Sequence, residues 1–193
     1  MAQPIDQKSL DTLFLEARTL RKWQDKPVPE SLLRRLYELT ILGPTSGNCL
    51  PSRFVFVVTP EGKERLIPHL TASNVEATRT APATVIVATD TEFWREMPAD
   101  GKFTKIFAGM GEPAQTHAFR NGTLQGGYLI LAARALGLDA GAMSGFDHAG
   151  VDGEFFADGR FKSNFLCNVG YGDHTELAPR PPRPAFETVC SLT

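Results

Sequence analysis

The chain has 193 residues, of which 42% are hydrophobic and 22% are charged, a composition typical of a globular domain. Its length predicts one domain, covering residues 1–193, with enough chain to bury a substantial core. Lysine and arginine (20) nearly balance aspartate and glutamate (22), so the net charge is -2 and no positive field attracts nucleic acid or an anionic membrane.

The three cysteines, Cys49, Cys167 and Cys190, are far apart in the sequence and odd in number. They form no CxxC pair and no spacing typical of metal ligands, so we expect neither a disulfide framework nor a metal site. Unpaired thiols favour a reducing, cytoplasmic environment. The longest apolar runs, such as 54–58, are far too short to cross a bilayer, and no membrane span is expected.

The first predicted element is a helix over residues 9–18, where apolar residues recur at i, i+3, i+4 and i+7. A second helix is expected to begin near Pro29, because proline suits a first helical turn, and to end at Gly43. Between these two residues, leucines recur with helical spacing at positions 32, 33, 36, 39 and 42. Each helix therefore presents one apolar face to a core.

Three runs rich in β-branched and aromatic residues predict strands at 54–58, 84–88 and 165–169. The first two show no alternation of polar and apolar residues, which indicates that both faces of the sheet are covered. Between them, residues 62–70 predict a helix that is broken near Pro68.

The segment 92–111 has no clear period and is rich in glycine, proline, methionine and charge, so we expect a mobile insertion or lid. A long helix is predicted over 114–136, with Gly126 and Gly127 inside it. Each glycine weakens a helix by roughly 1 kcal/mol relative to alanine, so close packing against another backbone is expected to compensate. The Pro-rich tail 179–184 predicts an extended segment. Helices and buried strands in alternation indicate an α/β or α+β layered domain.

Motifs of nucleotide-binding loops are absent from the sequence, which has neither a GxGxxG after a strand nor a phosphate-binding P-loop. The four histidines, His69, His117, His148 and His174, are isolated, and we interpret them as surface or satisfied core residues rather than bases or ligands. Because no set of acid–base side chains is evident, the sequence favours chemistry supplied by a bound cofactor.

The segment Gly43–Pro51 combines two prolines, two glycines, two hydroxyl groups and an asparagine between the second helix and the first strand. Upstream, Arg18, Thr19 and Arg21 place two cations and a hydroxyl within four residues. Guanidinium groups match phosphate oxygens in geometry, so the two segments predict a site for a polar, anionic ligand. A solvated helix end remains the alternative explanation for the two arginines.

Three segments, Arg18–Trp23, Pro44–Pro51 and Gly145–Asp147, resemble the FMN-dependent nitroreductase family in sequence and order. The similarity covers nearly the whole chain. It implies an α+β fold with a central, mainly antiparallel sheet flanked by helices. It also implies an intertwined homodimer with FMN at the subunit interface, and NADH or NADPH as the hydride donor for a small-molecule substrate. The extended tail would then be an exchanged arm, and the glycine pair would suit close packing at the two-fold axis.

The resemblance also implies individual cofactor contacts and no catalytic side chain, because FMN carries the hydride. Alternatives stay open for several of them. Asn74 also fits a helix cap or turn, Ser144–Gly145 a strand-to-helix turn capped by Asp147, and Arg180 and Arg183 a solvated tail. Which of these two arginines reaches the phosphate is left open, and Arg21 is expected near flavin N1/O2. The implied FMN contacts are Arg18, Thr19, Arg21, Pro44, Thr45, Ser46, Asn48, Asn74, Ser144, Gly145, Arg180 and Arg183.

Within the family, Gly43–Cys49, Ala142–Asp147 and Lys162–Asn164 resemble the malonic semialdehyde reductase subfamily of pyrimidine degradation. The implied reaction reduces malonic semialdehyde to 3-hydroxypropionate by two-step hydride transfer through FMN. The substrate carboxylate needs a cation, and Arg120 is the candidate for binding it. Further candidates are the lid residues Arg95, Lys102 and Lys105. For each of these cations, Arg120 included, a solvated surface charge is the alternative explanation.

Two positions depart from the family pattern, because Leu50 and Ser52 stand where glutamine and tryptophan are frequent. The Leu50 side chain cannot donate or accept a hydrogen bond, so one polar contact is lost. Two alternatives therefore accompany the substrate prediction. One is a broad nitroreductase or quinone reductase, and the other is a non-catalytic flavin-binding protein.

Overall fold

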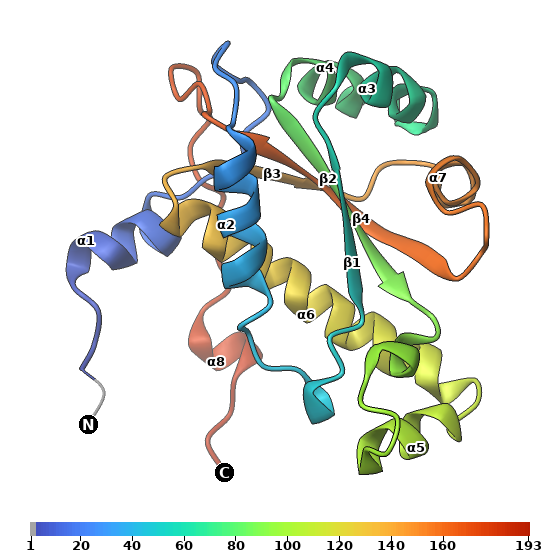
Figure 1. Cartoon of the computed structure of the whole chain (residues 1–193). Helices are drawn as coiled ribbons and strands as arrows, with labels where there is room; N and C mark the ends of the chain where they lie inside the picture. The colour runs from blue at the N-terminus through green and yellow to red at the C-terminus, as the bar shows by residue number, and fades with distance from the viewer. Residues whose placement is uncertain (1–2) are drawn as a thin grey trace.

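A four-stranded antiparallel sheet forms the centre of the computed structural model, which describes residues 3–193 (Figure 1). Met1 and Ala2, which the predicted domain includes, lie outside the described residues. The strand order is β1-β2-β4-β3, so β1 and β3 are the two edges. The predicted α+β class with a central antiparallel sheet is confirmed. The strands are β1 (Ser52–Val57), β2 (Ala83–Asp90), β3 (Asp139–Met143) and β4 (Phe161–Gly170).

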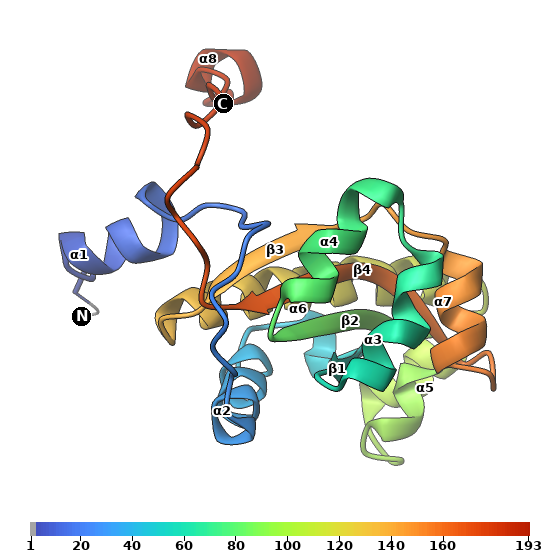
Figure 2. The ribbon, with the colours of Figure 1, turned by 90° about the horizontal axis from the view of Figure 1, so that it is seen from above.

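Helices cover both faces of the sheet (Figures 1 and 2). The long helix α6 (Pro113–Ala135) and helix α2 (Glu30–Thr40) pack on one face. On the other face lie α3 (Pro60–Leu66), α4 (Ala72–Thr80) and α7 (His148–Phe155). The predicted helices at 29–42, 62–70 and 114–136 are thereby confirmed, the second broken as expected by a 3₁₀ turn over Ile67–His69.

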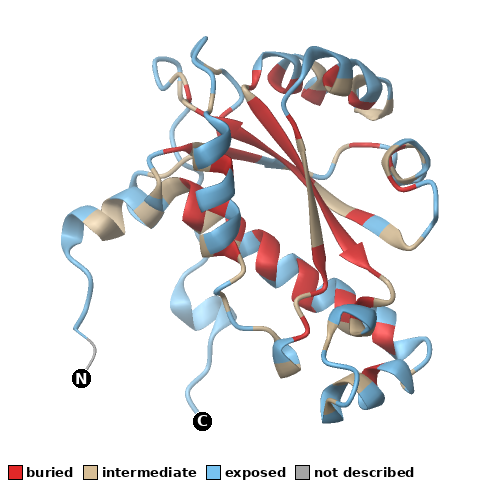
Figure 3. Ribbon diagram, in the orientation of Figure 1, coloured by how far each residue is buried: buried red, intermediate tan, exposed pale blue. Residues whose placement is uncertain are grey.

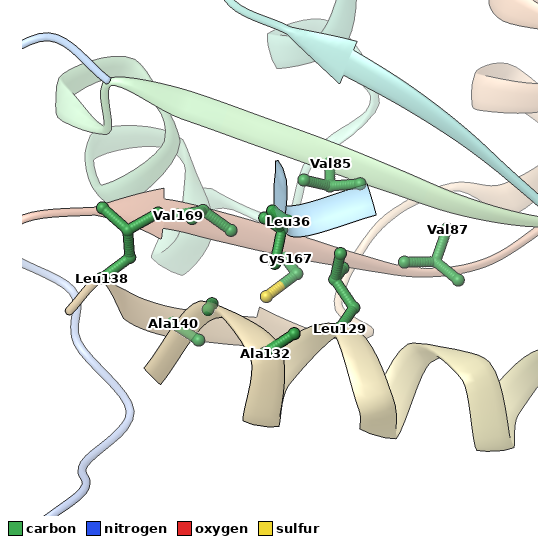
Figure 4. Packing of buried hydrophobic residues seen from close by; sticks show 10 residues of the cluster. Leu36, Val85, Val87, Leu129, Ala132, Leu138, Ala140, Cys167 and Val169 are labelled. Atoms are coloured by element: carbon green, nitrogen blue, oxygen red, sulfur yellow. The ribbon is translucent and has the colours of Figure 1, made fainter. Parts of the chain in front are cut away.

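The core divides into two layers because side chains alternate along each strand. Val85 and Val87 of β2 point toward α2 and α6, where they pack against Leu36 and Leu129 (Figure 4). Ile86 and Ala88 of β2 face α3 and α7. All eight residues of β2 are buried, as the unbroken apolar run predicted. Edge strand β1 is only half-buried over four of its six residues, so full cover of both its faces is not achieved within one chain.

The N-terminal helix is shorter than predicted. Helix α1 (Gln7–Leu10) continues as a π-helical segment over Asp11–Leu15 and then ends. The helix predicted up to Arg18 is wrong at its end, because the chain from there pairs with the edge of β3 through a Thr19–Ala140 bridge. Backbone hydrogen bonding to an open sheet edge therefore replaces the last helical turn.

The segment 92–111 is folded rather than irregular. It contains a 3₁₀ turn at Phe93–Glu96 and helix α5 (Lys102–Ala108). Phe93 and Phe107 are buried, and the Phe107 ring lies 4.7 Å from the ring of His117 on α6. Aromatic packing holds the segment to α6, and its expected role as a mobile insertion or lid stays a prediction.

The C-terminal tail leaves the body of the domain after Gly172 and is largely exposed (Figure 3). It ends in α8 (Phe186–Val189), which stands apart from the sheet and from the other helices (Figure 2). Phe186, Val189 and Leu192 are all exposed there. Residues 179–184 form no regular element, in agreement with the predicted extended segment. Within residues 3–193 no helix is both long and apolar enough to cross a membrane.

Candidate functional site

The first group of predicted cofactor residues lies along the edge of β3. Thr19 pairs with Ala140, and the Leu20 N–H donates to the Ala140 carbonyl at 3.1 Å. Leu20 is buried, whereas Thr19 and Arg21 are exposed. Gly141 permits this close approach, because a Cβ at that position would lie 2.4 Å from the Leu20 carbonyl oxygen. The edge of β3 therefore fixes the backbone that carries Arg21.

Arg21, Asn74 and Gly145 meet at this edge. Arg21 donates from Nη1 to the Ser73 carbonyl at 3.2 Å, and Asn74 donates from Nδ2 to the Gly145 carbonyl at 3.0 Å. The Thr71 hydroxyl donates to the same carbonyl at 2.9 Å. A Cβ at Gly145 would lie 2.8 Å from that hydroxyl and 2.9 Å from Asn74 Nδ2, so the turn needs glycine. α4 thus positions both Asn74 and the turn after β3.

The purely structural explanations for these residues, a helix cap or turn for Asn74 and a strand-to-helix turn for Ser144–Gly145, also agree with the structure. Asn74 lies in the first turn of α4, and Ser144–Gly145 joins β3 to α7. Asp147 occupies the N-cap position of α7, although its side chain forms no capping hydrogen bond. A turn that also places a backbone N–H near a ligand can serve both purposes.

Two arginines cross-link the N-terminal segment to the tail. Arg18 Nη2 donates to the Ala178 carbonyl at 2.5 Å, and Arg180 Nη2 donates to the Leu15 and Ala17 carbonyls at 2.9 and 2.6 Å. Among residues 3–193, Arg183 donates only to the nearby Pro181 carbonyl. Arg180, rather than Arg183, is therefore the tail arginine that lies beside the Arg18 segment.

A third arginine, Arg134, lies close to Arg180. Burial, followed by the charge of Arg180, lowers the pKa of the Arg134 guanidinium, which donates to the Leu13 carbonyl at 2.8 Å. The Nη1 and Nε groups of Arg18 and Arg180 carry no hydrogen bond to any residue of 3–193. Guanidinium N–H groups without a protein partner fit an anionic ligand such as a phosphate.

The second group is the loop between α2 and β1, which one face of α6 holds in place. The Tyr128 hydroxyl donates to the Pro44 carbonyl at 2.9 Å, and Asn121 Oδ1 accepts from the Ser46 N–H at 2.9 Å. Gln125 Oε1 accepts from the Ser52 N–H at 2.9 Å. This polar stripe was not predicted from the sequence, although the helical spacing of positions 121, 125 and 128 was a signal for it.

Ser46 and Asn48 are exposed, and their side chains form no hydrogen bond with residues 3–193. The Thr45 hydroxyl instead accepts from the Leu50 N–H at 3.2 Å. Phe103 of α5 packs against Gly47, where a Cβ would lie 2.9 Å from its ring. The loop therefore offers polar side chains to a ligand or a partner.

The candidate cations for a substrate carboxylate lie outside the loop. Arg120 is exposed on α6 and precedes Asn121, whose side chain accepts from the Ser46 N–H. Consecutive residues of a helix do not face the same way, so this contact does not place the Arg120 side chain at the loop. Arg95 pairs with Glu92 at 2.9 Å, and Lys102 and Lys105 lie on α5.

The two groups lie at opposite edges of the sheet. Gly145 follows edge strand β3, whereas the loop leads into edge strand β1, and the order β1-β2-β4-β3 places two strands between them. Neighbouring strands are about 4.8 Å apart, so the two edges are separated by about 14 Å. One chain therefore does not bring Asn74 and Asn48 to the same place.

Comparison with known proteins identifies relatives along the whole chain. A model of the nitroreductase family matches residues 15–171. The chain is 53% identical over 193 residues to a protein of Burkholderia lata that is named as an NADH dehydrogenase/NAD(P)H nitroreductase, with 97% of this chain and 98% of that one covered. A protein of the same name from Rhodopseudomonas palustris is 50% identical over 195 residues, with both chains fully covered.

Solved structures share the fold at low sequence identity. A Bacillus subtilis protein described as a nitroreductase superposes with a TM-score of 0.86 at 20% identity, covering 97% of this chain and 100% of that one. A protein from Exiguobacterium sibiricum, also described as a nitroreductase and solved with FMN, gives a TM-score of 0.85 at 18% identity, with both chains fully covered. The chain therefore belongs to the nitroreductase family and has the nitroreductase-like α+β fold.

Proposed function

We propose that this protein is an FMN-dependent NAD(P)H oxidoreductase that acts as a homodimer. The observation that carries the proposal is the meeting of Arg21, Asn74 and Gly145 at one edge of the sheet, beside the cations Arg18 and Arg180. Family membership and the NAD(P)H nitroreductase names of the relatives support the same activity.

The donor set at the β3 edge fits FMN. Arg18 and Arg180 have N–H groups available for a phosphate, and the Gly145 N–H forms no hydrogen bond within residues 3–193. The Asn74 side-chain amide donates to the Gly145 carbonyl and to the Thr71 hydroxyl, so its Oδ1 is left to accept a hydrogen bond from a flavin ring N–H. Arg21 would place positive charge at the pyrimidine end of the ring, where it would stabilise developing negative charge.

The second half of the site would come from a second copy of the chain. The loop before edge strand β1 carries the exposed residues Ser46 and Asn48, and a two-fold related partner could bring its own loop to this chain's β3 edge. The tail ends in a short helix with exposed Phe186 and Val189 that stands apart from the body, as expected of an exchanged arm. A Cβ added at Gly127 on α6 would meet nothing within 4 Å, which leaves room for a partner helix, whereas Gly126 packs against Phe165 of its own chain.

Bound FMN would supply hydride transfer in two steps, first from NADH or NADPH and then to an oxidised substrate. The chain's part is to bind and orient. Arg18 and Arg180 would anchor the phosphate, the Gly145 turn would bring backbone close to the ring, and the loop would close the pyrimidine edge.

The proposed substrate is malonic semialdehyde, reduced to 3-hydroxypropionate. Its aldehyde carbon takes the hydride, its carbonyl oxygen takes a proton, and the nicotinamide is oxidised. Arg120 is the proposed partner for the carboxylate, because it is exposed on the turn of α6 that holds Ser46. In steady-state assays Arg120→Gln should raise KM for the semialdehyde far more than it lowers kcat.

Two measurements test the function. Anaerobic mixing of the FMN-loaded protein with NADH and with NADPH should bleach the flavin absorbance with at least one of them. If neither bleaches it, the protein is better explained as a non-catalytic flavin-binding protein. A kcat/KM much higher for quinones or nitroaromatics than for malonic semialdehyde would replace the proposed substrate by a broad reductase activity.

A further inference from the structure

The loop that carries Ser46 and Asn48 ends in a strained turn. Asn48 has φ 53° and Leu50 has φ 38°, both in the left-handed region. Asparagine tolerates this conformation, but a leucine at positive φ is uncommon, because its Cβ crowds the backbone. Strained residues of this kind persist only where the surrounding structure fixes them, and they cluster at functional sites.

The Arg53 side chain on β1 holds this turn through hydrogen bonds to its backbone. Its Nη1 donates to the Leu50 carbonyl at 3.2 Å and to the Ser52 carbonyl at 2.9 Å. The Leu50 N–H donates to the Thr45 hydroxyl, so both backbone polar groups of Leu50 are bonded. A planar guanidinium can hold two neighbouring carbonyls and a carboxylate at once, which a lysine ammonium cannot reproduce.

Arg53 is held in turn by Asp90, whose side chain is fully buried at the end of β2. Arg53 Nη2 donates to Asp90 Oδ2 at 2.7 Å, and the Asp90 N–H donates to the Pro51 carbonyl at 2.8 Å. A second guanidinium, that of Arg160, donates to both Asp90 oxygens at 2.8 and 2.6 Å and to Glu96 at 3.0 Å. The carboxylate therefore keeps one cation if the other is removed.

The geometry points to Arg53 as a positioning residue for the flavin: we propose that it holds the Asn48–Leu50 turn in the conformation in which Asn48 meets the cofactor bound to the partner chain. Within residues 3–193, Arg53 donates to the Leu50 and Ser52 carbonyls and to Asp90. The inference rests on the proposed function, because the effect of the turn is measured as the dissociation constant of FMN.

Arg160 provides a matched control, because it binds the same carboxylate without touching the turn. Arg53→Gln should raise the dissociation constant of FMN about tenfold or more, since the loop is no longer preorganised, while Arg160→Gln should stay within about twofold of wild type. Arg53→Lys keeps a cation beside Asp90 and covers the case in which Arg53→Gln does not fold. Its dissociation constant should also rise about tenfold.

Hydrogen exchange of the flavin-free protein tests the turn without the cofactor. Amides of residues 46–50 should exchange faster in Arg53→Lys and Arg53→Gln, with no such change in Arg160→Gln. The inference is overturned if the Arg53 variants match wild type in exchange and in FMN affinity, or if Arg160→Gln is impaired equally. A wild-type protein that binds no FMN would instead refute the proposed function, and the exchange result would still decide whether Arg53 holds the turn.

Discussion

The contact between Gly141 and Leu20 should control both stability and cofactor binding. A Cβ at position 141 would lie 2.4 Å from the Leu20 carbonyl oxygen and 3.3 Å from the Trp23 ring. Ordinary contacts begin near 3.4 Å, so Gly141→Ala must push the Arg18–Trp23 segment away from β3 by about 1 Å. This segment carries three of the residues proposed to bind FMN.

The expected loss of stability follows from the contacts of Leu20 that this displacement breaks. The hydrogen bond from the Leu20 N–H to the Ala140 carbonyl, 3.1 Å long, contributes about 1 kcal/mol. Leu20 is 1% exposed, and lifting part of its side chain into water costs about 1 kcal/mol more. Gly141→Ala should therefore lower the free energy of unfolding by about 2 kcal/mol and weaken FMN binding as well.

Urea unfolding and a fluorescence titration with FMN measure the two effects. Gly153→Ala in α7 is the matched control, because a Cβ there meets nothing within 4 Å, and the substitution should stabilise the helix by up to about 1 kcal/mol. If Gly141→Ala has wild-type stability and wild-type FMN affinity, the β3 edge does not position the Arg18–Arg21 segment.

Three further predictions follow from other contacts. Gly127→Ala should weaken the dimer in sedimentation equilibrium if α6 helices pack closely at the two-fold axis, whereas an unchanged or tighter dimer would exclude such packing at this residue. Burial lowers the pKa of Lys63 to about 8, below the value of about 10.4 expected in an unfolded chain, so the unfolded state binds more protons in this window. Stability in urea should then rise between these pH values, and Lys63→Met should remove the rise; parallel curves would contradict the assignment. Burial raises the pKa of Cys167 to about 12 and also raises that of Cys49, so a thiol reagent should label only Cys190 in the native protein, and rapid labelling of all three would refute this.

The spacing of apolar residues along the sequence predicted the elements that bury a large apolar face. α2, α6 and the buried strand β2 follow from leucine spacing and β-branched runs, because a large apolar face must be covered. β3 was missed because Asp139–Met143 consists mainly of alanine and glycine. Pairing with β4 on one side and with the Thr19 segment on the other makes it a strand, and both contacts are distant in sequence.

In the candidate site, too, local patterns were visible in the sequence and contacts between distant segments were not. Local motifs pointed to the loop and to the arginine segment, since their residue types carry the chemistry. They could not show that the two groups lie at opposite edges of the sheet, which depends on strand order. Arg53 and Asp90 escaped notice for a related reason: they are 37 residues apart, and only the antiparallel pairing of β1 with β2 brings them together.

A mixed dimer tests the central claim, that each flavin site combines the β3 edge of one chain with the loop of the other. Arg21→Ala removes a contact from the first group, and Asn48→Gly removes one from the second while keeping a residue that accepts positive φ. Each variant alone should bind FMN weakly. The two chains, co-expressed with different tags and purified through both, should bind about one FMN per dimer with wild-type affinity, because one of the two sites is then intact. If the mixed dimer binds FMN no better than either variant alone, the site is not shared between chains.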